Sequence, residues 1–272
     1  MRACNLLPFL LLLAACQTNP YTGRSQILWT SEDEEIRMGL QAYGDITGKV
    51  KIDKSRALND PLQRVGRAIS TIADRDRARL KKTPYEWEFI LIRADKTLNA
   101  WALPGGKVAF YTGIYPILQD EAGMAIVMGH EVSHALLRHG GERYSQALIV
   151  AGATTAAVYA AHNESTERQI AFAAAVGLAT EYGFIKPYSR SHETEADKYG
   201  LMLAARAGYD PAPAIGVWER MARQGGGRPP EILSTHPDPL RRVENMKRWL
   251  PEARALYEQS RQQPNAPLPS IR

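Results

Sequence analysis

The segment spanning residues 120–139, DEAGMAIVMGHEVSHALLRH, constrains the fold of this chain more than any other. It has the apolar pattern of a buried helix, yet it carries His130, Glu131 and His134 near its middle. Residues four apart share a helix face, so the two histidines lie one above the other with the glutamate beside them. Buried charge is costly unless it is paired or bound to a metal. The segment therefore predicts one zinc ion per subunit, bound by both histidines, with Glu131 activating a water molecule.

A third protein ligand must come from elsewhere, because catalytic zinc usually has three protein ligands and one open position. The segment SHETEAD, residues 191–197, places Glu193 and Asp197 four apart on one helix face. Glu193 could bind the metal while Asp197 orients a ligand histidine from behind. Spacing alone leaves Glu195 and His192 as alternatives.

The N-terminus has the pattern of a bacterial lipoprotein signal. Arg2 precedes an apolar run that is too short to span a bilayer, and Leu-Ala-Ala stands directly before Cys16. We expect residues 1–15 to be removed and Cys16 to be lipidated, which anchors the protein to a membrane surface. Gln17 resembles the residue that follows the cysteine in lipoproteins sorted to the outer membrane of Gram-negative bacteria. The predicted location is therefore the periplasmic face of that membrane.

The composition argues against nucleic acid as a partner. The 272 residues carry a formal net charge of +5 without a dense block of Lys and Arg, whereas nucleic-acid-binding domains usually concentrate these residues. Removal of residues 1–15 also removes Cys4 and leaves Cys16 as the sole cysteine. No disulfide is then expected.

The remaining pattern predicts one mostly helical α+β domain with a small antiparallel sheet. Residues 16–30 suggest a tether, 31–261 the catalytic domain and 262–272 a Pro-rich disordered tail. The first expected elements are a helix after the capping box of Ser31 and Glu34 and a helix starting near Asp60-Pro61. A strand over 85–93 and two strands around Pro104-Gly105-Gly106 follow. Then come the zinc helix, ending at Gly140-Gly141, and helices after 190, 210 and 240.

Two apolar, Ala-rich segments follow the zinc helix, at residues 147–161 and 170–185. Each is near or below the length needed to cross a bilayer. We interpret them as helices packed in the core, with a membrane hairpin as the alternative.

Three motifs of the chain are HEVSH, SRSHETEADKYG and STHPDPLRR, and NPYTGRSQ, NAWALPGG and AGYDP accompany them, from about residue 17 to 250. Together they resemble the motifs of peptidase family M48, the group that contains the heat-shock protease HtpX, the CAAX prenyl proteases and periplasmic lipoprotein peptidases. The resemblance implies a zincin-like fold, zinc as cofactor, Glu193 as the third ligand and Asp197 as the acid behind a ligand histidine.

The resemblance also implies roles for His236 and Arg242 in STHPDPLRR. His236 matches a histidine near the metal that either stabilises the oxyanion or occupies the fourth zinc position as a latch. Arg242 matches an arginine near the same site. From the residues alone, a histidine before proline is more typical of a loop cap.

The segment with Asn99, Ala100, Trp101 and Ala102 resembles the family's edge strand above the active site. An open strand edge can pair with an extended peptide and bind its backbone. From the residues alone, it is also compatible with an ordinary hairpin strand.

The activity implied by the resemblance is a zinc endopeptidase that degrades misfolded or unassembled envelope proteins. The alternative is a chaperone or assembly factor for outer-membrane proteins whose zinc site is latched. The expected partners are protein or peptide substrates, the membrane through Cys16, and the outer-membrane assembly machinery.

Overall fold

The computed structural model describes residues 16–161, 170, 189–224, 232, 236 and 239–271. The chain divides into two compact units. The smaller unit comprises Met1–Glu35 and Leu137–Lys186, and the larger unit comprises Ile36–Leu136 and Pro187–Arg272. The described helices are α2 (Glu32–Thr47), α3 (Arg56–Arg79), α4 (Tyr115–Leu118), α5 (Glu121–Leu136), α6 (His139–Ala161), α8 (Arg190–Arg206), α9 (Pro213–Arg223) and α11 (Pro239–Glu258), with the 3-10 turn η1 (Thr112–Ile114). The described strands are β1 (Cys16–Thr18), β2 (Ser25–Ile27), β3 (Glu88–Ile92), β4 (Ala100–Leu103) and β5 (Lys107–Tyr111). The predicted class, mostly helical with small sheets, is confirmed.

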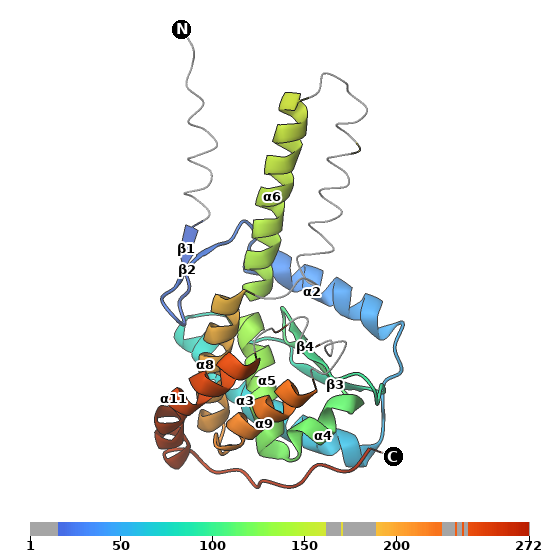
Figure 1. Ribbon diagram of the computed structural model, residues 1–272, viewed down its shortest axis with the longest axis vertical. Coiled ribbons are helices and arrows are strands. Elements are labelled where there is room, and N and C mark those ends of the chain that lie inside the picture. Colours follow the sequence, from blue (N-terminus) through green and yellow to red (C-terminus); the bar gives the residue numbers. More distant parts are fainter. Residues whose placement is uncertain are drawn as a thin grey trace. The chain divides into compact units, whose positions relative to one another are not determined.

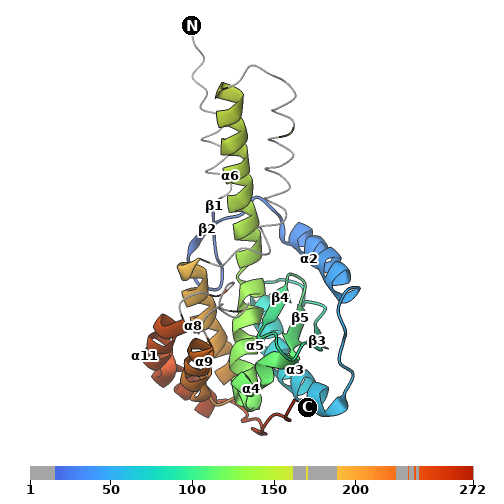
Figure 2. The ribbon, with the colours of Figure 1, turned by 45° about the vertical axis from the view of Figure 1, so that its right-hand side comes forward.

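Helix α5 is the centre of the larger unit, packed against α3, α8 and β4 (Figures 1 and 2). All of its residues are buried, as the apolar pattern predicts. Its closest approach to α8 is at two glycines, where a Cβ on Gly129 would lie 2.5 Å from the carbonyl oxygen of Gly200. The missing side chains let two helix backbones touch one residue before His130.

The larger unit holds a three-stranded sheet in the order β3-β5-β4. The hairpin from β4 to β5 turns at Gly105 and Gly106, which both have a φ near +90° that glycine adopts readily. Strand β5 lies between its two neighbours. It pairs antiparallel with β4 and parallel with β3. The predicted antiparallel pairing is therefore wrong for β3 and β5, and β4 is left at an edge.

Helix α2 begins as predicted, because the main-chain N–H of Ser31 donates to Glu34 and the N–H of Glu34 donates to the Ser31 hydroxyl. Helix α3 begins earlier than predicted, at Arg56. Pro61 lies inside the helix rather than at its start. Proline has no N–H, so the carbonyl of Ala57 lacks its usual donor within the helix. Ala57 is exposed, and its carbonyl can bond to water instead. The inner face of this helix is buried, with Leu62, Val65, Ile69 and Ile72.

The zinc helix ends before the glycines expected to terminate it. Helix α5 stops at Leu136, and Gly140 and Gly141 lie in the first turn of α6. The break is at Arg138, whose φ is +59° and whose guanidinium donates to both carboxylate oxygens of Glu35 at 2.8 and 3.0 Å. A Cβ at Gly141 would clash with that carboxylate, so this glycine makes room for an ion pair.

The predicted tether is a β-hairpin in the smaller unit. Strands β1 and β2 pair antiparallel, and the side chain of Asn19 donates to the carbonyl of Leu137 at 3.0 Å. Arg24 forms two hydrogen bonds with Glu142 near the start of α6, at 2.6 and 3.0 Å. Cys16 is exposed at the beginning of this hairpin.

Helix α6 covers the first of the two Ala-rich segments, and the second lies outside the described residues apart from Ile170. Ala151 is buried against Ala147 and Leu148, whereas Val150 is 65% exposed. These three residues belong to one helix, so the predicted packing of both segments in the core stays a prediction. Among the described helices, none has the length and apolar character needed to cross a bilayer.

The predicted disordered tail instead packs along the start of α5. The N–H of Glu121 donates to the carbonyl of Ala266 at 3.0 Å, and the N–H of Ala122 donates to the Asn265 side chain at 2.9 Å. The N–H of Leu268 donates to the carbonyl of Gln119 at 2.8 Å. Helix N-termini expose N–H groups without intrahelical partners, so residues 262–271 act as a cap for the central helix.

Candidate metal centre

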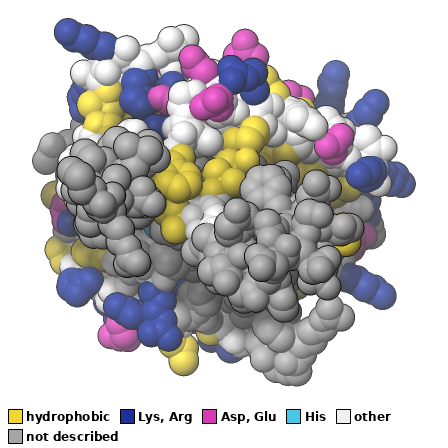
Figure 3. Space-filling model, turned by 90° about the horizontal axis from the view of Figure 1, so that it is seen from above, with side chains coloured by type: hydrophobic (Ala, Val, Ile, Leu, Met, Phe, Trp, Pro, Cys, Tyr) yellow, Lys and Arg dark blue, Asp and Glu magenta, His cyan; other side chains and the backbone are white. Residues whose placement is uncertain are grey.

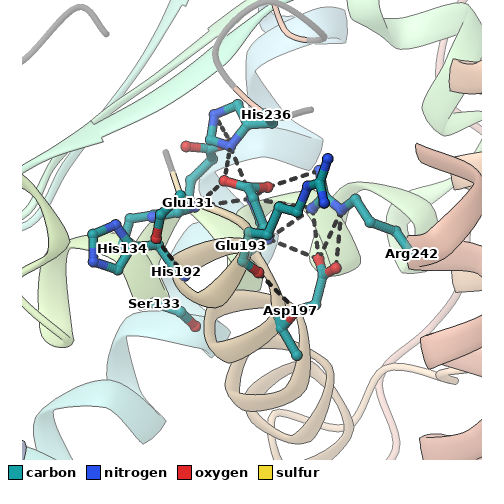
Figure 4. A network of polar contacts seen from close by, with 12 residues as sticks. Glu131, Ser133, His134, His192, Glu193, Asp197, His236 and Arg242 are labelled. Carbon is teal, nitrogen blue, oxygen red and sulfur yellow. Dashed lines mark hydrogen bonds and ion pairs between the residues drawn. The ribbon is translucent and has the colours of Figure 1, made fainter. Parts of the chain in front are cut away.

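Four buried side chains, those of His130, His134, Glu193 and His236, converge with ligand atoms within 4.8 Å of one another. Helix α5 supplies the first two and α8 the third, while His236 lies before α11. Figure 4 shows Glu193 between His236 and Arg242. The structure thus places Glu193 in the cluster, and neither Glu195 nor His192 belongs to it.

The spacing of these atoms fits a zinc ion. The Nε2 atom of His130 lies 3.0 Å from Nε2 of His134 and 3.1 Å from Nδ1 of His236. Glu193 Oε1 lies 3.4 Å from His134 Nε2 and 3.0 Å from His236 Nδ1. Tetrahedral zinc with bonds of about 2.0–2.1 Å holds its ligand atoms about 3.3 Å apart, and imidazole nitrogen and carboxylate oxygen are its usual donors. The residues present therefore fit the metal.

Asp197 lies behind the cluster, as the motif implies. Its Oδ1 is 3.0 Å from Nδ1 of His130, whose other nitrogen faces the ligand atoms. Such a carboxylate fixes the ring orientation and tautomer of a ligand histidine. Burial raises the pKa of Asp197 to about 6, although the neighbouring guanidinium of Arg242 acts in the opposite direction.

Glu131 lies next to the ligands without being one of them. Its side chain is 2% exposed, and Oε1 has no hydrogen-bond partner among the described residues. The nearest charged group is His236, whose Nε2 is 3.6 Å away. Burial raises the pKa of Glu131 to about 7, and the positive charge of His236 opposes that rise only in part. A carboxylate with such a pKa can both accept and return a proton near neutral pH.

Glu193 has the opposite electrostatic setting. Its burial alone would raise its pKa, but the positive charges of His236 and Arg242 outweigh burial and lower the pKa to about 2. Glu193 is therefore ionised throughout the neutral range, as a metal ligand must be.

Comparison with known proteins places this geometry in a family. The model of peptidase family M48 matches residues 59–250, which include every member of the cluster. The chain belongs to peptidase family M48. Peptidases of this family depend on zinc, so the predicted zinc metalloendopeptidase and its cofactor are confirmed.

Named relatives of this M48 peptidase come from mitochondria and from bacteria. The chain is 35% identical to the mitochondrial metalloendopeptidase OMA1 of Saccharomyces cerevisiae over 257 residues, covering 89% of this chain and 71% of the yeast protein. It is 30% identical to the beta-barrel assembly-enhancing protease of Escherichia coli over 257 residues, covering 90% of this chain and 50% of the relative. The chain thus spans only half the length of that bacterial relative.

Arg242 of this M48 peptidase contacts the ligands from outside the cluster. Its guanidinium donates to Asp197 at 2.5 and 2.9 Å and lies 3.1 Å from Oε2 of Glu193. It therefore acts through the ligands and the acid behind them. The sequence motif placed Arg242 near the site but did not show which groups it contacts.

Trp218 on α9 is a member of the site that sequence reasoning missed. The ring is fully buried, lies under the guanidinium of Arg242 and meets His130 edge-on with centroids 5.7 Å apart. In the sequence it is one apolar residue of an amphipathic helix, and only the crossing of α9 brings it to the metal centre.

Strand β4 is the edge of its sheet and packs against α5. Ala100 and Asn99 are buried, and the side chain of Asn99 accepts a bond from the N–H of Ala100 at 2.9 Å. Trp101 and Ala102 are partly exposed, and Trp101 meets Tyr43 edge-on at 6.4 Å. Ala100, Trp101 and Ala102 thus lie on an edge strand beside the zinc helix, and Asn99 directly precedes that strand.

Proposed function

We propose that this peptidase cleaves misfolded or unassembled proteins of the bacterial cell envelope. The proposal is supported by the lipoprotein-like N-terminus and by the Escherichia coli relative, whose name describes a protease that enhances β-barrel assembly. The mitochondrial relatives carry the same catalytic domain in another compartment, so the envelope location depends on Cys16 and its signal.

The observation that carries the mechanism is the buried Oε1 of Glu131, which has no hydrogen-bond partner among the described residues and lies beside four converging ligand atoms. His130, His134 and Glu193 would hold zinc, which polarises the scissile carbonyl and lowers the pKa of water. Glu131 accepts the proton of the attacking water and passes it to the leaving amine. Its pKa of about 7 suits both transfers.

His236 has a second place in this mechanism. Its Nε2 faces Glu131 at 3.6 Å. Burial alone would lower the pKa of His236, but the negative charges of Glu193 and Glu131 outweigh burial and raise it. A protonated imidazole near the reacting carbonyl stabilises the charge that develops on oxygen. The peptide substrate would lie in extended form along the open edge of β4 and contribute main-chain hydrogen bonds.

The mechanism is tested with Glu131→Gln, which removes the proton acceptor and keeps the shape. We expect loss of casein degradation by at least about a hundredfold, within the range for loss of general acid–base catalysis, with zinc content unchanged. Glu258→Gln, an exposed change of the same kind on α11, is the control and should leave both unchanged. Casein cleavage by Glu131→Gln at the wild-type rate would refute the assignment.

The membrane attachment is a separate proposal with a separate test. Cys16 is exposed at the start of the β1–β2 hairpin, where acyl chains would not disturb the packed residues. Cys16→Ser should abolish labelling by radioactive palmitate and release the protein from the membrane fraction. Unchanged outer-membrane fractionation of Cys16→Ser would remove the lipid anchor from the proposal.

The alternative function, an assembly factor with a latched site, is favoured by one observation. His236 Nδ1 lies 3.0 Å from Glu193 Oε1 and 3.1 Å from His130 Nε2, and is thus itself one of the four converging ligand atoms. His236→Ala separates the two functions. A gain of casein cleavage supports the latch, and a loss supports oxyanion stabilisation.

A further inference from the structure

A cavity in the larger unit contains none of the residues of the metal centre. Its volume is about 550 Å³, within the usual range of small-molecule sites. It lies where α3, the C-terminal end of α8 and the end of α11 meet the residues that follow α11. Four arginines line it, Arg75, Arg79, Arg206 and Arg261.

The charges around this cavity are unbalanced. No Asp or Glu is among the described residues that line it, and the nearest carboxylate in the ion-pair network is Asp76. Asp76 accepts two bonds from Arg206, at 2.6 and 2.7 Å, and lies 3.5 Å from Arg79. Asp76 therefore pairs with two of the four arginines, Arg206 and Arg79, which leaves an excess of positive charge at the cavity.

Arg75 and Arg261 are the two arginines available for a ligand. Neither forms an ion pair with any residue in the described part of the chain, and both are exposed. The hydroxyls at the cavity already donate to main-chain carbonyls, Thr71 to Arg67 and Ser260 to Tyr257. The remaining side-chain donors are the guanidinium groups and the amides of Gln259 and Gln263. Guanidinium groups recognise phosphate and carboxylate by paired N–H bonds.

The walls of the cavity are held in place by other contacts. Tyr199 donates to Asp76 at 2.7 Å and supports the carboxylate that orients Arg206. Gly208 has a φ of +94°, and its carbonyl accepts a bond at 2.8 Å from the N–H of Gln263, a lining residue. A Cβ at Gly208 would clash with the carbonyl of Arg261, so the glycine lets the last segment close the cavity.

Unspecific surface charge has a different distribution. On the face drawn in Figure 3, Lys and Arg side chains are interspersed with Asp and Glu. The cavity instead combines four arginines with a concave shape, so an anion there meets several guanidinium groups at once.

We propose that this cavity binds a phosphate group, which belongs either to a soluble phosphate compound or to the headgroup of an anionic phospholipid. A doubly charged anion matches the excess of positive charge better than a single carboxylate. The planar forks of Arg75 and Arg261 contact its oxygens, and Arg206 and Arg79 complete the positive surface.

The test measures binding of inorganic pyrophosphate to the full protein by titration calorimetry at low salt. The double variant Arg75→Gln/Arg261→Gln should weaken binding at least tenfold. The matched control, Lys54→Gln/Arg254→Gln, removes the same charge at exposed positions outside the cavity and should change binding less than twofold. Equal weakening in both variants, or no pyrophosphate binding to the wild type, would overturn the site.

A second arm identifies the source of the phosphate. Vesicles with phosphatidylglycerol are compared with phosphatidylcholine vesicles in sedimentation, with and without pyrophosphate. A lipid headgroup is assigned if the wild type, but not the double variant, sediments with the anionic vesicles and pyrophosphate releases it from them. A soluble compound is assigned if the protein binds pyrophosphate but does not sediment with the vesicles. Casein cleavage by the double variant should equal that of the wild type, because both residues lie outside the metal centre. The proposal thus stands or falls independently of the proposed envelope function.

Discussion

The guanidinium of Arg242 lies over the ring of Trp218, with Cζ 3.4 Å from the ring centroid. The same guanidinium holds Asp197, and the same ring meets His130. A single aromatic side chain from α9 thus supports the arginine and a predicted zinc ligand from one side. Desolvated cation–π contacts contribute about 2 kcal/mol.

Replacing Trp218 should therefore affect catalysis as well as stability. We expect Trp218→Leu to lower kcat about tenfold with little change in KM, because Arg242 loses the surface that orients it. Trp218→Phe keeps an aromatic face and should retain most of kcat. Steady-state kinetics with a fluorogenic peptide, beside thermal melts of both variants, checks this. Equal kcat losses in the Leu and Phe variants would show that packing volume alone matters.

Asp197→Asn should weaken zinc binding by about 10- to 100-fold, the range for loss of a carboxylate behind a ligand histidine. The carboxylate lies 3.0 Å from His130 Nδ1, and its charge also balances Arg242. Competition with a chromogenic chelator gives the zinc dissociation constant directly. Asp45→Asn, at an exposed position of α2, serves as the control and should bind zinc like the wild type.

Gly200→Ala should destabilise the larger unit by about 1–3 kcal/mol, the cost of overpacking a filled core. A Cβ at this position would lie 2.6 Å from the main-chain nitrogen of His130, and backbone atoms cannot yield as a flexible side chain can. Gly44→Ala is the opposite case, since open space surrounds that position on α2. It should stabilise the helix by up to about 1 kcal/mol. Urea unfolding measures the free energy of unfolding of both variants, which should fall for Gly200→Ala and rise for Gly44→Ala.

The ion pair of Asp76 and Arg206 should make stability depend on acid pH. Burial would raise the pKa of Asp76, but hydrogen bonds from Arg206 and Tyr199 outweigh it and lower the pKa. A lowered pKa in the folded state stabilises the protein above the unfolded pKa of about 4, and this contribution disappears as the pH falls through the folded value. Asp76→Asn should thus cost about 1.5–3 kcal/mol at pH 7, as hydrogen bonds to charged groups do.

The pH dependence of that difference provides the check. The melting temperatures of wild type and Asp76→Asn should differ clearly at pH 7 and converge below pH 4. A difference that stays constant from pH 7 to pH 3 would show that the carboxylate charge contributes nothing.

The active-site helix was predictable because its information is local. The spacing of His130 and His134 defines a shared helix face, and the apolar neighbours define burial. Glu193 needed more, since spacing alone left Glu195 and His192 open and the family motif decided between them. Its position beside His134 depends on the close packing of α8 against α5, which no local pattern reports.

Other features depend on partners far away in the sequence. The positive φ of Arg138 ends the zinc helix before Gly140, and its ion-pair partner Glu35 lies 103 residues earlier. The hairpin of residues 16–30 has the composition of a tether, yet Asn19 bonds to Leu137 across 118 residues. Strand β3 pairs in parallel with β5, the strand that follows the hairpin, and not with β4, which is next to it in the sequence. Composition and periodicity describe each segment but not the contacts that complete it.

The tail that caps α5 has a consequence for the order of events during synthesis. Asn265 and Ala122 are 143 residues apart, and ribosomes add roughly 5–20 residues per second, so the helix carrying HEVSH waits about 7 to 30 s for its cap. Glu193 and Arg242 also emerge during that interval. All residues of the metal centre are therefore synthesised before the segment that caps their central helix.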